Sequence, residues 1–237
     1  MDPTQRVALV TGASRGIGAA VAAAYRDLGY AVLATARRIE ASGDPDVLTV
    51  PGDVAEPGVG ARLVEAAMNR FGRIDTLVNG AGVFVAKPFT EYTDEDFASV
   101  VGVNLRGFFE VSRSAIAAML TREGGGHVVN ISTSLVGNAD ARVTGAMASL
   151  TKGGLDAVTR SLAIEYATRG IRVNTVALGV IRTSMHPTDP GGANAALHPV
   201  NRMGEVEDVV RAILYLEQAP FVTGEIAHVD GGQSAGH

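Results

Sequence analysis

Residues 7–18 read Val7-Ala-Leu-Val-Thr-Gly-Ala-Ser-Arg-Gly-Ile-Gly18, an apolar run followed at once by a loop with three glycines. The apolar run predicts a buried strand, and the alanine-rich residues after the loop predict a helix. A glycine-rich turn in this context presents backbone N–H groups and a helix N-terminus to a pyrophosphate. We expect Gly12 to allow the tight turn, Gly16 the close approach of phosphate, and Gly18 the packing of helix on strand. The alternative is that the glycines serve only the turn.

Short β-branched runs alternate with stretches of helical period along the rest of the chain. Strand runs lie at 31–33, 47–50, 76–78, 127–131 and 172–176, and helices are expected near 17–28, 57–71, 94–121, 147–169 and 205–217. Strands without polar alternation are typical of a parallel sheet that helices cover on both faces. The sequence therefore predicts one α/β domain over 1–237, a doubly wound parallel sheet of the Rossmann type. Residues 183–200, with three prolines and no regular period, are expected to form a lid over the carboxyl edge of the sheet rather than a plain surface excursion.

Composition excludes several classes of protein. The chain has 237 residues, of which 46% are hydrophobic and 19% charged, and it has no cysteine. A full core can therefore form, whereas disulfides, thiolate catalysis and cysteine-ligated metal sites cannot, and we expect no metal and a cytoplasmic location. No run approaches eighteen uncharged apolar residues, and the net charge is −5. We expect neither a membrane nor a nucleic acid as partner.

Seven further motifs follow the glycine loop. In chain order they are Pro51-Gly-Asp-Val54, Asn79-Gly-Ala-Gly82, Val103-Asn-Leu-Arg-Gly107, Asn130-Ile-Ser-Thr-Ser-Leu-Val-Gly137, Thr151-Lys-Gly-Gly-Leu155, Arg172-Val-Asn-Thr-Val-Ala-Leu-Gly-Val-Ile-Arg-Thr183 and Val229-Asp-Gly-Gly232. With the glycine loop they resemble the short-chain dehydrogenase/reductase family over essentially the whole chain. Two departures are Gly80, where the family has a second Asn, and Ala177-Leu178, where Ser-Pro is usual. The resemblance implies an NAD(P)-dependent oxidoreductase with a small-molecule substrate, assembled as a homodimer or homotetramer.

The resemblance also implies a set of cofactor contacts. They are Gly12, Ser14, Arg15, Gly16, Ile17, Gly18, Arg37, Arg38, Asp53, Val54, Asn79, Ala81, Gly82, Lys152 and Thr183. Members that prefer NAD place an acid at the end of the second strand, whereas the 2′-phosphate of NADP needs cations. Here Ala36 takes the acid position and two arginines follow it, so we expect NADP(H) rather than NAD(H). The alternative is that Arg37 and Arg38 only solvate a loop.

The resemblance assigns catalytic roles to Asn104, Ser134 and Lys152, with Ser132 as the alternative serine. In the family a Tyr four residues before the Lys donates or accepts the proton, and the nearby ammonium lowers the pKa of the phenol. Tyr and Lys at that spacing share one face of a helix. In this chain the residue four before Lys152 is Ala148.

Several explanations of Ala148 remain open. Lys152 could supply the proton through water, or His186 in the expected lid could do so. The hydride acceptor could need no proton on oxygen, as with an imine or an activated alkene. The chain could bind NADP without turnover, as a regulatory or accessory protein, or Ala148 could be an engineered replacement. We expect an NADP(H)-dependent oxidoreductase, with the catalytically silent NADP-binding protein as the alternative, and structural roles for His127 and His228.

Overall fold

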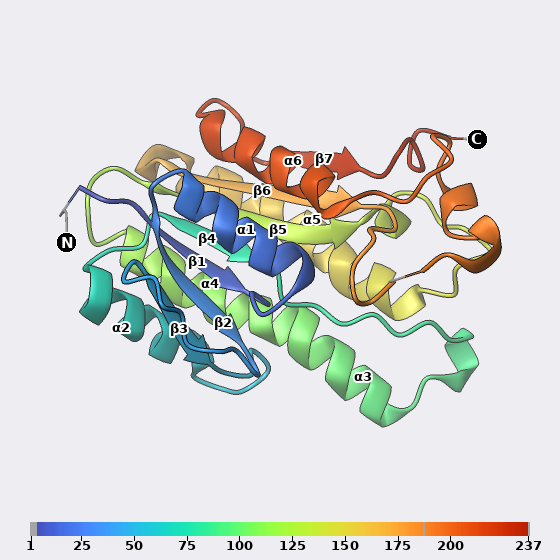
Figure 1. The fold of residues 1–237 in the computed structure, drawn as a ribbon, viewed down its shortest axis with the longest axis horizontal. Coiled ribbons are helices and arrows are strands. Elements are labelled where there is room, and N and C mark those ends of the chain that lie inside the picture. The colour runs from blue at the N-terminus through green and yellow to red at the C-terminus, as the bar shows by residue number, and fades with distance from the viewer. Residues whose placement is uncertain (1–3, 187, 237) are drawn as a thin grey trace.

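The first apolar run forms β1 (Val7–Thr11), which is buried at every position. In the computed structural model, which describes residues 4–186 and 188–236, β1 lies between β2 and β4 in a seven-stranded sheet in which neighbouring strands are parallel (Figure 1). The strand order is β3-β2-β1-β4-β5-β6-β7. The other strands are β2 (Ala31–Ala36), β3 (Val47–Pro51), β4 (Thr76–Asn79), β5 (Gly126–Thr133), β6 (Ile171–Leu178) and β7 (Ile226–Val229). The prediction of a doubly wound α/β fold is confirmed, and β7 extends the six strand runs predicted from the sequence.

Helices cover both faces of the sheet. On one face α1 (Gly16–Asp27) and α6 (Val206–Gln218) bury Val21 and Ile213 in one core cluster, and Figure 1 shows both helices in front of the sheet. On the other face α2 (Val59–Phe71), α4 (Gly107–Met119) and α5 (Ala146–Tyr166) bury Leu63, Ile116 and Ala163 in a second cluster. Apolar packing on both faces explains why the strands lack polar alternation.

The helix expected over 94–121 differs from the prediction. It is α3 (Asp94–Val101), a π-helical segment over Gly102–Arg106, and α4, which ends at Met119. Thr93 caps α3 with a capping box, since its hydroxyl accepts from the Asp96 N–H at 3.2 Å and its own N–H donates to the Asp96 carboxylate at 3.0 Å. The π segment contains Asn104, and such segments are frequent at functional sites.

The carboxyl edge of the sheet carries the loops that the sequence predicts to bind a nucleotide. β1 and β4 are neighbours although β2 and β3 lie between them in sequence, so the loops after β1 and β4 border one crevice at the point where the strand order reverses. In Figure 1 the strand arrowheads point towards the side where the C-terminus and the orange segment near residue 190 lie. That segment, the expected lid over 183–200, contains two short 3₁₀ helices, Pro190–Gly192 and Ala195–Leu197. Pro187 of the expected lid lies outside the described residues.

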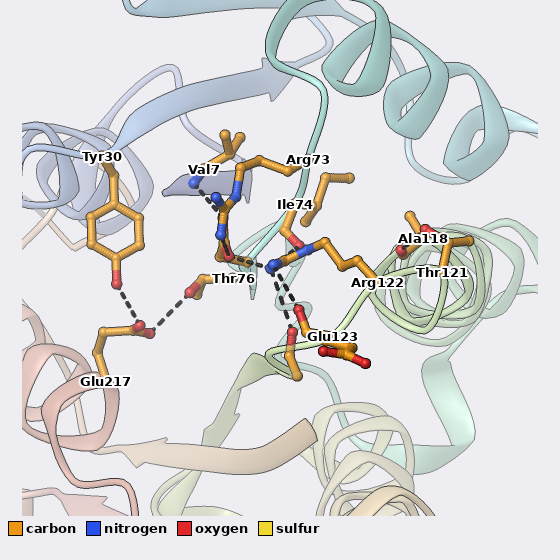
Figure 2. A network of polar contacts seen from close by, with 12 residues as sticks. Val7, Tyr30, Arg73, Ile74, Thr76, Ala118, Thr121, Arg122, Glu123 and Glu217 are labelled. Carbon is orange, nitrogen blue, oxygen red and sulfur yellow. Dashed lines mark hydrogen bonds and ion pairs between the residues drawn. The ribbon is translucent and has the colours of Figure 1, made fainter. Parts of the chain in front are cut away.

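The amino edge of the sheet carries a separate polar network, drawn in Figure 2. The carboxylate of Asp75, just before β4, accepts from the Val7 N–H at 2.8 Å and from the Arg73 guanidinium at 2.8 and 2.7 Å. Arg122 also donates to Asp75 and reaches the Ile74 carbonyl at 3.3 Å. These bonds fix the start of β1 against the start of β4, at the opposite end of the strands from the loops after β1 and β4. None of the helices in the described part of the chain has the length and apolarity needed to cross a bilayer.

Candidate nucleotide-binding and active site

A cavity of about 930 Å³ lies at the crevice between the loops that follow β1 and β4. Such a volume falls within the range of small-molecule and cofactor sites, roughly 300–1,000 Å³. Thirteen of the residues expected to contact a cofactor line it: Gly12, Ser14, Arg15, Gly16, Ile17, Gly18, Arg37, Arg38, Asp53, Val54, Ala81, Gly82 and Thr183. The structure therefore brings together residues that are spread over more than 170 positions of the chain.

The glycine loop has the geometry expected of a phosphate cradle. Gly12 and Gly16 adopt φ values of +72° and +56°, in the left-handed region that favours glycine. A Cβ on Gly18 would lie 2.3 Å from the Gly12 carbonyl oxygen, so α1 can pack this closely on the loop only with glycine at position 18. Since α1 begins at Gly16, its N-terminal N–H groups border the cavity.

The charges around the cavity are predominantly positive. Arg15, Arg37 and Arg38 line it, and Asp53 is the one acid among the described residues that do so. The side chains of these three arginines take part in none of the hydrogen bonds and ion pairs found among the described residues, whereas Arg26 nearby pairs with Asp44 at 2.9 Å. The three guanidinium groups are thus free to bind an anion.

Asn104 connects the loop after β4 to α5. Its carboxamide accepts from the Val83 N–H at 3.0 Å and donates to the Val83 carbonyl at 3.1 Å and to the Thr151 hydroxyl at 3.2 Å. Asn104 and Thr151 are both buried. No role for Thr151 was predicted from the sequence, where its position next to Lys152 was the available signal.

Lys152 lies on α5 beside the cavity without lining it. Its ammonium donates to the Ile131 carbonyl of β5 at 2.7 Å. A Cβ on Gly82 would lie 3.5 Å from the Lys152 nitrogen and 3.6 Å from the Asn104 Oδ1, so both side chains reach the loop at Gly82. Burial lowers the pKa of Lys152 to about 8, and the negative charge of Asp156 partly offsets this effect.

Ser134 begins a 3₁₀ turn immediately after β5. Its side chain is buried, and its hydroxyl donates to the Gln233 Oε1 at 2.8 Å. Ala148 is buried four residues before Lys152 on α5. The alternative serine, Ser132, is buried within β5. Gln233 was not predicted from the sequence, where the glycine pair that precedes it was the available signal.

Asn79 and the histidines take other positions. Asn79, expected at the cofactor, does not line the cavity; its amide donates to Ser112 and Asn130, both at 2.9 Å, beneath the site. His127 is buried and hydrogen-bonded, as its expected structural role requires, whereas His228 is exposed. His186 is half-buried and does not line the cavity. Over the described residues, no cluster of three or more His, Cys, Asp or Glu could hold a metal ion.

Comparisons with known proteins extend over the whole chain. The family model described as Enoyl-(Acyl carrier protein) reductase matches residues 12–234. L-xylulose reductase of Mesocricetus auratus is 38% identical over 240 residues, which cover 96% of each chain. The structure of ElxO with NADP bound has a TM-score of 0.90 and 27% identity, covering 98% of this chain and 100% of the other. The 3-ketoacyl-(acyl-carrier-protein) reductase from Brucella melitensis, complexed with NADH, has a TM-score of 0.89 and 28% identity, with the same two coverages.

Proposed function

The chain belongs to the short-chain dehydrogenase/reductase family of NAD(P)-dependent oxidoreductases, and from this membership we propose an NADP(H)-dependent enzyme that transfers hydride to or from a small carbonyl, imine or activated alkene substrate. One observation carries the proposal. The Lys152 ammonium and the Asn104 carboxamide both lie beside Gly82, which lines the arginine-rich cavity. Groups that can hold a nicotinamide ribose and support acid–base chemistry thus lie beside a site built for a dinucleotide.

The residues present fit a dinucleotide phosphate. Neighbouring backbone segments lie so close to Gly12 and Gly18 that neither position has room for a Cβ. The N-terminus of α1 faces the cavity, and three arginines are free to bind an anion. When bound, the nicotinamide ring supplies or accepts the hydride. We assign Lys152 to the nicotinamide ribose and Arg15, Arg37 and Arg38 to the 2′-phosphate.

Arg37→Ala and Arg38→Ala are expected to raise the Kd for NADPH by about tenfold each, because each variant removes a charge-assisted hydrogen bond to phosphate. The Kd for NADH should change by less than about twofold, because NADH has no 2′-phosphate for these arginines to bind. Fluorescence titration of both nucleotides measures the two constants. Arg211→Ala, on α6, is the matched control and should alter neither. Equal losses for NADPH and NADH would contradict the 2′-phosphate assignment.

The proton has to come from a group other than a phenol at position 148. In our proposal Ser134 polarises the substrate oxygen, and Lys152 gives or takes the proton through water. A pKa of about 8 suits this task, because a general acid works best when its pKa lies near the working pH. Asn104 acts as a positioning residue, since its hydrogen bonds hold Val83 and Thr151 around Lys152.

Reduction is expected to slow as the pH rises through about 8, because the Lys152 ammonium then loses its proton. The profile of kcat/KM against pH measures this decline. Lys152→Arg separates the two roles of the lysine: arginine stays charged at every accessible pH but cannot give a proton. Loss of turnover with retained NADPH binding supports proton supply by Lys152. A kcat/KM that stays constant up to pH 9.5, roughly one and a half units above the pKa of Lys152, contradicts proton supply by this lysine.

Binding and turnover test the proposed function separately. NADPH binding is measured by fluorescence and calorimetry, and NADPH consumption is measured with a panel of ketones, aldehydes, imines and activated alkenes. Absence of binding at millimolar NADPH would refute the proposal altogether. Tight binding with no consumption across the panel would replace it with the catalytically silent nucleotide-binding protein.

We also propose that the chain forms a homodimer or homotetramer. Large apolar side chains are exposed on successive helices of one face of the sheet, Phe97 on α3, Phe109 on α4 and Ile164 on α5. Exposed apolar side chains on the helices that follow β4 and β5 are available for contact with a second copy of the chain. Light scattering in solution tests the assembly, and a monomer mass would contradict it.

A further inference from the structure

A tightly held turn follows β7. The Asp230 carboxylate accepts from the backbone N–H groups of Gly232 at 3.0 Å and Ser234 at 2.9 Å. Gly231 and Gly232 adopt φ values of +59° and +90°, which glycine tolerates best. The Asn138 amide donates to the Gln233 carbonyl at 2.7 Å. The turn is therefore fixed both to itself and to the loop that follows Ser134.

This turn delivers one side chain to the expected catalytic serine. Gln233 is 2% exposed and Ser134 is 1% exposed, and the Ser134 hydroxyl donates to the Gln233 Oε1 at 2.8 Å. A serine hydroxyl has a single proton, so this bond uses the donor that would polarise a substrate oxygen. Among the described residues, none accepts a hydrogen bond from the Gln233 amide nitrogen. This nitrogen is also not one of the fully buried polar atoms that lack a partner there. A donor is thus left over beside Ser134.

We propose that Gln233 is a substrate-contacting residue, whose carboxamide forms the hydrogen-bonding site for the substrate oxygen together with the Ser134 hydroxyl. The proposal rests on the proposed function and deepens it. When a substrate oxygen enters, the serine proton turns towards it and the Gln233 N–H groups supply a second donor. Preorganised amide donors stabilise negative charge that develops on oxygen, although an amide gives up no proton. Gln233 therefore contributes the hydrogen bond that a phenol at position 148 would make, while the proton still comes from another group.

Gln233→Met tests this role, because methionine fills a similar volume but donates no hydrogen bond. With an acetoacetyl thioester as the probe, kcat/KM of the parent should fall about 100-fold, the loss typical of one oxyanion donor. In the Ala148→Tyr background the phenol makes a second bond to the oxygen, so the same substitution should cost less than about fivefold. Gln218→Met, the same change at an exposed position on α6, is the control in both backgrounds.

A second measurement does not depend on turnover. NADP⁺ and the acetoacetyl thioester are both oxidised, so no hydride passes between them when the enzyme binds both. Calorimetry measures the Kd of the thioester in this dead-end complex. Gln233→Met should weaken thioester binding about tenfold, as expected for one lost hydrogen bond, and should leave NADP⁺ binding unchanged. An unchanged thioester Kd overturns the proposal, as does an equal loss of kcat/KM in both backgrounds or a gain in the parent background. A parent that forms the dead-end complex but consumes no NADPH would refute the proposed function alone.

Discussion

Ala148→Tyr is expected to raise kcat/KM for carbonyl reduction by about 10²- to 10⁴-fold, the contribution of a positioned general acid. Position 148 is buried on α5, one turn before Lys152. Side chains four residues apart on a helix share a face, so the new phenol lies near the ammonium. A neighbouring positive charge favours the phenolate and lowers the pKa of the phenol towards neutrality. Steady-state kinetics on the substrate panel measure the gain.

Ala148→Phe is the matched control for this experiment. It adds the same ring without the hydroxyl group, so any gain from filling space appears in both variants. The gain from acid catalysis appears in the tyrosine variant alone. Similar kcat/KM values for the two variants would show that the pocket around Ser134 and Lys152 does not place a phenol for catalysis. NADPH binding should be equal in the parent and both variants, because position 148 does not line the nucleotide cavity.

The nucleotide half of the site could be predicted because each of its parts is a local motif. Gly12, Gly16 and Gly18 lie within seven residues, between a strand and a helix, and their backbone geometry follows from that context. The two arginines after β2 follow the strand end at which a ribose is recognised. In a parallel sheet all strand ends of one kind meet at the same edge, so strand order alone brings such motifs together.

The catalytic half could be predicted only in part, because its contacts join residues far apart in sequence. Gln233 meets Ser134 across 99 positions, and no periodicity or motif spacing indicates that pairing. The π segment at Asn104 was missed for a related reason: the apolar pattern of 94–121 continues through it, so the prediction joined two helices. Asn79 lies in a family motif, but its amide links β4 with β5 and α4. The sequence does not reveal this link, because it depends on which strand lies next to β4.

Glu217→Leu is expected to destabilise the fold by about 3–5 kcal/mol, because a buried donor left without its acceptor costs about 1–3 kcal/mol and four donors lose their acceptor here. The Glu217 carboxylate lies near the end of α6, its side chain 7% exposed, and Figure 2 shows the Tyr30 and Thr76 hydroxyls pointing towards it. It accepts hydrogen bonds from four side chains on different elements: Tyr25 at 3.0 Å, Tyr30 at 2.7 Å, Thr76 at 3.1 Å and His127 at 2.8 Å. A leucine would leave all four donors without their acceptor.

The neighbours of His127 determine which of its nitrogens carries the proton. The Asn174 Oδ1 accepts from the Glu225 N–H at 3.1 Å and its Nδ2 donates to the Val222 carbonyl at 3.0 Å, which fixes the orientation of the amide. The same Nδ2 therefore donates to the His127 Nε2 at 3.1 Å, and the Nδ1–H of the neutral ring donates to Glu217. Burial lowers the pKa of His127, although Glu217 partly offsets this effect. His127 is thus a neutral donor to the carboxylate.

Urea unfolding at neutral pH measures the loss of stability in Glu217→Leu. A loss of this size also lowers Tm by roughly 10 °C in a chain of this length. Glu207→Gln, at an exposed position on the same helix, is the matched control and should stay within about 0.5 kcal/mol of the parent. A Glu217→Leu variant as stable as the parent would show that the four donors find other acceptors without cost.

The pH dependence of this difference isolates the carboxylate. Burial alone would raise the pKa of Glu217, but the hydrogen bond from His127, the positive charge of that ring once acid protonates it, and hydrogen bonds from Tyr30 and Tyr25 lower it to about 2. Because the folded pKa lies below the ordinary value of 4.5, the unfolded chain binds the proton first, so this stabilisation is complete above about pH 4.5 and is lost as the pH falls towards 2. Carboxylates outside the network titrate alike in the parent and in Glu217→Leu and cancel, so the difference between them reports Glu217 together with its partner His127. The free energies of unfolding of the parent and of Glu217→Leu should therefore converge by about 3 kcal/mol between pH 5 and pH 2. A constant difference over that range would show that the network stabilises the fold through packing rather than through the charge of Glu217.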